Sequence, residues 1–111
     1  MIWRGQFDLT VWISPMKALF WLSYCRHEEL VGVVIIEARN LLEARMIALI
    51  ESLDKFADFA EGYELSSQEA AMISSSSIGR MLPPAEVNRL ITWLESEAAR
   101  KGIQTDRRVV R

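Results

Sequence analysis

Apolar and polar residues alternate near the start of the chain. Every second residue from 6 to 13 is apolar, which is the period of a half-buried strand, and Pro15 follows it. Two runs rich in aromatic and β-branched residues, 17–25 and 30–38, then flank a polar stretch at 26–29. This pattern predicts an antiparallel hairpin formed by 17–25 and 30–38, preceded by a strand at 6–13.

The period changes from strand to helix at Asn40. Asn40 suits a helix N-cap, and Glu43 three residues later gives a pattern similar to a capping box. Apolar residues then recur at helical spacing, and Gly62 suits the position after a helix. We therefore predict a helix at about 41–61. Its expected buried stripe is Leu42, Met46, Leu49, Ile50 and Leu53.

A second helix is predicted at about 84–101. Pro84 suits its first position and Gly102 its end. The serine-rich segment 63–82 is expected to be irregular, with one or two short strands, although Ser66 and Glu69 would also suit one capped helical turn. The apolar stripe of the second helix is Val87, Leu90, Ile91, Leu94 and Ala98.

Together these elements predict an α+β fold, with a sheet of three or four antiparallel strands packed with two helices. The chain has 111 residues, which fits a single domain at 1–102 followed by a flexible basic tail at 103–111. Met16 offers an alternative start of translation, which would make 1–15 an N-terminal extension. The alternation at 6–13 argues against that alternative.

The hairpin strands are apolar on both faces. Strands of this kind are covered on both sides in the folded protein. Our main expectation is that another copy of the chain covers one face, so that the protein is a homodimer formed through its sheet. The alternative is that the first helix covers one face and the last helix covers the other. Gly32 within the second strand indicates a bulge or a close backbone approach. The expected dimer face is Leu19, Trp21, Val33 and Ile35.

Composition narrows the class of protein. Half of the residues are apolar and a quarter are charged, which excludes a disordered chain. No uncharged run approaches the roughly 20 residues of a membrane-spanning helix, and no secretory signal is visible. We therefore expect a cytoplasmic protein without membrane contact, whose single cysteine, Cys25, is reduced.

The net charge of −2 conceals an acidic middle at 28–69 and a basic end. The basic end at 100–111 supports an alternative function, association with nucleic-acid phosphates. A further alternative is a small-ligand or anion site in the serine-rich loop 74–80, through Ser76, Ser77 and Arg80, although the loop lacks the P-loop frame. The basic residues expected to contact nucleic-acid phosphates are Arg100, Lys101, Arg107, Arg108 and Arg111.

Residues able to carry chemistry are few. Cys25, His27 and Glu29 alternate, but they fall in the predicted turn, and the chain has no second cysteine or histidine to complete a zinc site. No catalytic constellation is apparent, so we expect no enzymatic activity, no cofactor and no metal. The leading hypothesis is a small non-enzymatic interaction or regulatory module that acts as a homodimer.

Overall fold

The fold comes from a computed structural model that describes residues 17–54 and 56–102. The strand predicted at 6–13 and the tail at 103–111 lie outside the described residues. The described elements are β1 (Ala18–Arg26), β2 (Glu29–Ala38), α2 (Leu41–Ile50), β3 (Asp58–Glu64), α3 (Ser67–Ala71), a 3₁₀ turn η1 (Ser75–Ser77), β4 (Met81–Leu82) and α4 (Pro84–Lys101).

The strands form an antiparallel sheet in the order β3-β1-β2-β4, so the predicted α+β fold is confirmed. The predicted hairpin is present, with Ala18 paired to Ala38 and Arg26 paired to Glu29. Its turn is shorter than the four residues expected. His27 and Glu28 both have positive φ, as in the two-residue turns that match the twist of a hairpin.

Gly32 fulfils both expectations placed on it. The register of β1 and β2 shifts at Gly32, where Val31 bulges out of the ladder. A Cβ atom at Gly32 would also collide with the carbonyl oxygen of Leu82 and the side chain of Met81. Glycine at this position therefore lets β4 approach β2.

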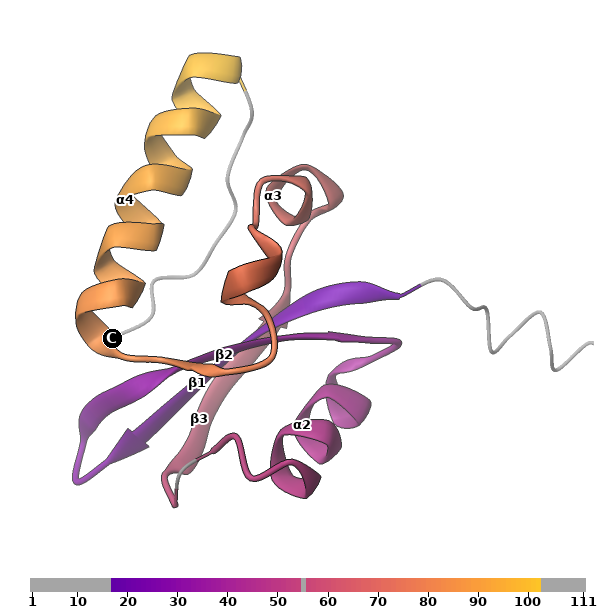
Figure 1. Cartoon of the computed structure of the whole chain (residues 1–111), viewed down its shortest axis with the longest axis vertical. Helices are drawn as coiled ribbons and strands as arrows, with labels where there is room; N and C mark the ends of the chain where they lie inside the picture. The colour runs from indigo at the N-terminus through magenta and orange to yellow at the C-terminus, as the bar shows by residue number, and fades with distance from the viewer. Residues whose placement is uncertain (1–16, 55, 103–111) are drawn as a thin grey trace, which may run out of the picture.

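Both faces of the sheet are covered by the same chain. Figure 1 shows α3 and α4 on one side of the sheet and α2 on the other. One buried cluster contains sheet residues Leu19, Trp21, Val33 and Ile35, packed with residues that include Leu82, Val87, Leu94 and Ala98. The second contains Phe20, Leu22, Tyr24, Val34, Ile36 and Ala38, packed with Ala44, Ala48 and Ala57.

The first helix is shorter than predicted. It ends at Ile50, and 58–61, which we expected to be helical, belong to β3. The end is a Schellman motif, in which the Ser52 amide donates to the Leu49 carbonyl and the Leu53 amide donates to the Ala48 carbonyl, at 3.1 and 2.8 Å. Ser52 holds the left-handed conformation that glycine usually provides, with φ 56°.

Strand β3 is stabilised by aromatic pairs with β1. The rings of Trp21 and Tyr63 stack with centroids 6.3 Å apart, on the α4 side. The rings of Tyr24 and Phe59 meet edge to face at 5.9 Å, on the α2 side. Such cross-strand pairs favour a strand over a continued helix.

The segment predicted to be irregular contains more helix than expected. Ser66 caps α3 by accepting a hydrogen bond from the Glu69 amide at 3.0 Å, which confirms the alternative of one capped turn. One short strand, β4, is also present. The last helix, α4, has the bounds predicted, with Pro84 in its first turn and Gly102 after its end at φ 71°.

Candidate functional site

Helix α2 faces the sheet with its small side chains. Ala44 and Ala48 are fully buried against the sheet. The larger residues of the predicted stripe point to solvent, so that prediction was wrong for most of the stripe. We call them the α2 ridge: Leu42, Met46, Leu49 and Ile50, with exposed fractions of 68%, 48%, 63% and 73%.

Side-chain hydrogen bonds cap the start of α2. Asn40 Oδ1 accepts a hydrogen bond from the Glu43 amide at 2.8 Å. The Glu43 carboxylate accepts one from the Arg39 amide at 2.7 Å and pairs with the Arg39 guanidinium. These hydrogen bonds from Arg39 lower the pKa of Glu43 below its ordinary value. The start of the helix is therefore capped, and the burial of Ala44 and Ala48 shows which of its faces meets the sheet.

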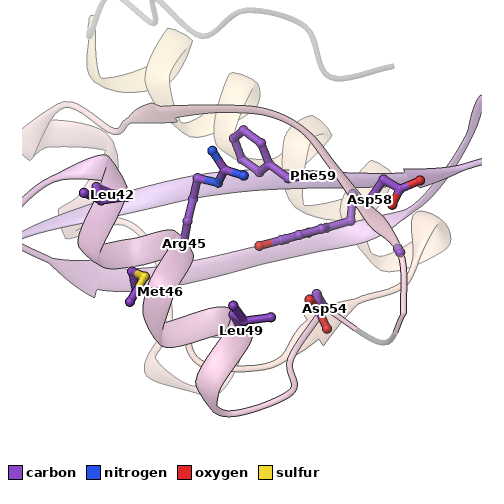
Figure 2. A pocket seen from close by; sticks show the side chains of 9 residues that line it. Leu42, Arg45, Met46, Leu49, Asp54, Asp58 and Phe59 are labelled. Carbon is purple, nitrogen blue, oxygen red and sulfur yellow. The ribbon is translucent and has the colours of Figure 1, made fainter.

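A hollow of about 310 Å³ lies beside the ridge, between α2 and β3 (Figure 2). We call it the α2–β3 hollow. Ridge residues form one wall, and residues of β1, β3 and the loop before β3 form the rest. Its lining residues are Tyr24, Leu42, Arg45, Met46, Leu49, Asp54, Ala57, Asp58 and Phe59.

Arg45 crosses this hollow toward β3. Its guanidinium carbon lies 4.0 Å from the centroid of the Phe59 ring, and Figure 2 shows the guanidinium over that ring. A cation over an aromatic face is attracted by the quadrupole of the ring. This contact fixes one wall of the hollow and holds the Arg45 charge inside its own chain.

Two carboxylates, Asp54 and Asp58, lie at the hollow on the loop side. Burial raises the pKa of the Tyr24 hydroxyl, the nearby Asp54 carboxylate raises it further, and Arg45 opposes this. Tyr24 is therefore neutral at physiological pH. Among the described lining residues there is no histidine, cysteine or serine. The apolar walls and aromatic rings of the hollow suit an apolar or aromatic side chain, whereas Asp54 and Asp58 at its loop side suit a cation.

The predicted dimer face is buried within the chain. Trp21, Val33 and Ile35 have no exposed surface and Leu19 retains 9%. They pack in the cluster that includes α4, because the last helix covers this face of the sheet. These four side chains are therefore not a surface in this structure. The arrangement is the alternative that we stated, and the homodimer itself stays a prediction.

The serine-rich loop uses its polar groups internally. The Ser76 hydroxyl lies 2.9 Å from the Ser74 hydroxyl, and Arg80 Nε donates to the Ser76 carbonyl at 2.8 Å. The Arg80 guanidinium also pairs with Glu86, which raises the pKa of Arg80. Ser77 closes η1 through its amide. Arg80 therefore carries a neutralising partner, and anion binding here stays a prediction without added support.

The basic residues of the chain end are only partly described. Arg100 pairs with Glu97 on α4, and Lys101 is exposed at the last position of the helix. Arg107, Arg108 and Arg111 lie outside the described residues. Nucleic-acid association through this end stays a prediction.

Cys25 is a free, partly exposed thiol near the end of β1, while His27 lies in the turn. In residues 17–54 and 56–102 no group of three or more metal-ligating side chains comes together. None of the helices in the same ranges is long and apolar enough to cross a membrane.

A second hollow of about 480 Å³ opens at the start of β1, where its lining includes Lys17, Glu37 and Glu64.

Comparisons with family models, curated proteins and solved structures found no match. The site therefore rests on the geometry of this chain.

The sequence pattern predicted the ridge residues as an apolar stripe, but it predicted that this stripe would be buried in the core. Arg45, Asp54, Asp58 and Phe59 were not singled out. One signal was available, because Ala44 and Ala48 form their own apolar line on the opposite side of the helix. A helix that is apolar on two sides leaves its buried face undecided.

Proposed function

We propose that the protein is a non-enzymatic interaction module that forms a homodimer through the α2 ridge. The observation that carries this proposal is the orientation of α2, with alanines toward the sheet and large apolar side chains toward solvent. A contiguous apolar patch of this kind on a folded domain is typical of an interaction site. Both faces of the sheet are covered within the chain, so we place the proposed interface on the helix rather than on a face of the sheet.

The size of the patch suits a second copy. Phe56, in the loop after α2, is a further large apolar residue on the surface, with 95% of its area exposed. Together with the four ridge residues it presents roughly 600 Å² of apolar surface. The same patch on two copies would bury about 1,200 Å² in total, which is at the lower end of stable protein interfaces.

The chemistry of the ridge also suits pairing with itself. Its members are spaced so that Met46 lies in the middle, four residues after Leu42 and four before Ile50. In an antiparallel pair of α2 helices centred on Met46, Leu42 of one copy meets Ile50 of the other, which is the symmetry of a two-fold interface.

The charges of α2 do not oppose this pairing. Glu43 is paired with Arg39, and Arg45 lies over Phe59 in its own chain. Glu43 therefore has a neutralising partner, and Arg45 is held over a ring beside the ridge. The four ridge residues themselves are uncharged.

The test is the mass of the protein in solution, measured by sedimentation velocity over a range of concentrations. Met46→Glu places a charge at the centre of the ridge, and glutamate is a good helix former. Trp93→Glu is the matched control, because Trp93 lies on α4 and is 44% exposed, close to the 48% of Met46. Circular dichroism checks that both variants fold.

We expect the wild type and Trp93→Glu to be dimers and Met46→Glu to be a monomer. A wild type that stays monomeric at the highest concentration would overturn the proposal, and the ridge would then belong to a different protein or to another part of this chain. A dimer that persists in Met46→Glu would overturn it as well.

A further inference from the structure

Phe56 is an exposed aromatic residue in a strained conformation. Its side chain is 95% exposed and its φ is 66°, in the left-handed region that bulky residues rarely adopt. The backbone is held there by Arg26, whose guanidinium donates to the Phe56 carbonyl at 3.0 Å. Strain of this kind costs free energy and is typical of binding and switching sites. An exposed phenyl ring on a fixed backbone is suited to act as an anchor.

Phe56 stands beside the α2–β3 hollow without entering it. Asp54 and Ala57, on either side of it in the sequence, both line the hollow, whereas Phe56 does not. In the antiparallel pair of α2 helices proposed above, the end of α2 of one copy lies beside the start of α2 of the other, where Leu42 lines the hollow. Phe56, in the loop that follows α2, would therefore come to the Leu42 end of the hollow of the opposite chain.

The hollow has the size and the walls for a phenyl ring. A cavity of roughly 150 Å³ holds benzene, and the α2–β3 hollow measures about 310 Å³. Its walls include Leu42, Met46 and Leu49, which give apolar and sulfur contacts to a ring. Buried aromatic anchors in such pockets carry a large share of the binding energy at protein interfaces.

We propose that Phe56 of each chain inserts into the α2–β3 hollow of the partner subunit, so that each copy gives one anchor and receives one. This inference rests on the proposed homodimer and specifies how it is held together. The hollow is then a binding site for an aromatic side chain of the same protein, and the site is completed only by the second copy.

Two variants separate the anchor from its receptor. Phe56→Gly removes the ring and fits the positive φ, so the folded monomer is preserved. Leu42→Asp places a charge on the wall of the hollow, and aspartate in the first turn of a helix is favourable. We expect each variant alone to raise the dimer dissociation constant at least about 30-fold, the size of a strong interface residue.

Mixing the two variants is the decisive experiment. The Leu42→Asp chain keeps its Phe56 and the Phe56→Gly chain keeps its hollow, so a mixed dimer retains one complete anchor contact. A homodimer of either variant retains none. Sedimentation of an equimolar mixture should therefore show tighter association than either variant alone. Intermolecular nuclear Overhauser effects between the Phe56 ring and the Met46 methyl of differently labelled chains should be present in the wild type.

The outcomes distinguish the Phe56 anchor from the homodimer proposal on which it rests. If the wild type is monomeric, the homodimer fails and the anchor fails with it. If the wild type is dimeric but Phe56→Gly associates as tightly, or the mixture associates no better than the tighter variant alone, the ridge interface stands and the anchor is overturned.

Discussion

Arg45 of α2 lies over the ring of Phe59 in β3, with 4.0 Å between the guanidinium carbon and the ring centroid. This contact joins the helix to the edge strand of the sheet across the α2–β3 hollow. Phe59 also meets Tyr24 edge to face. Arg45, Phe59 and Tyr24 therefore form a row of contacting side chains that lines the hollow.

Replacing Arg45 with alanine should loosen the packing of α2 on β3. We expect the free energy of unfolding to fall by about 0.5–1 kcal/mol, the size of an exposed cation–π contact. Urea titration measures this loss, with Arg89→Ala on the surface of α4 as the control. An Arg45→Ala protein as stable as the control variant would show that the contact does not stabilise the fold.

Gly32 is expected to be intolerant of any side chain. In Gly32→Ala the new methyl would meet the carbonyl oxygen of Leu82, a backbone atom that cannot move without opening the pairing of β2 and β4. We expect a loss of about 1–3 kcal/mol, as for other overpacked sites. Thermal and urea unfolding would measure it.

Gly62 provides the matched control for Gly32. A Cβ atom at Gly62 would come closest to methyl groups of Leu22 and Leu41 and to the ring of Phe59, which are side-chain atoms rather than backbone. Gly62→Ala should therefore cost less than Gly32→Ala. An equal loss at both positions would show that β4 does not pack as closely on Gly32 as the geometry indicates.

The parts of the fold that could be predicted are those marked by strong local signals. The hairpin was visible because two β-branched and aromatic runs flank a polar stretch, and α4 because Pro84 and Gly102 mark its ends. The end of α2 had no comparable signal. Ser52 takes the left-handed position there, and serine occurs at many other places in proteins.

The site could not be predicted because it depends on tertiary structure. Helix α2 is apolar on more than one side, so its pattern alone did not decide whether the alanines or the leucines face the sheet. The hollow combines Tyr24 from β1, Arg45 from α2 and Phe59 from β3. Their proximity follows from the placement of β3 beside β1, where the sequence pattern predicted a continuing helix.

Acid should weaken the start of α2. Arg39 lowers the pKa of Glu43 through hydrogen bonds, so the folded state holds the ionised carboxylate more strongly than the unfolded state does. The stabilisation is complete above the ordinary pKa of 4.5 and is lost as the pH falls through the lower value in the folded state. Glu43→Gln should therefore be less stable than the wild type at neutral pH and equally stable in strong acid.

Urea titrations near neutral pH and at about pH 2 would measure the effect of Glu43→Gln. Glu28→Gln, in the exposed turn between β1 and β2, is the control and should show little change at either pH. A difference between Glu43→Gln and the wild type that is the same at both pH values would contradict the ionic origin of this stabilisation.

The orientation of α2 makes opposite predictions for two neighbouring positions. Ala48 is fully buried against the sheet, so Ala48→Leu must force larger atoms into a packed layer and should cost about 1–3 kcal/mol. Met46 is 48% exposed, so Met46→Ala should change the stability of the monomer by no more than about 0.5 kcal/mol. Urea unfolding at two protein concentrations separates monomer stability from the contribution of association.

If the ridge were core instead, as its spacing alone suggests, Met46→Ala would cost about 2–5 kcal/mol and Ala48→Leu would be nearly neutral. The order of these two losses therefore decides which face of α2 is available to a second copy.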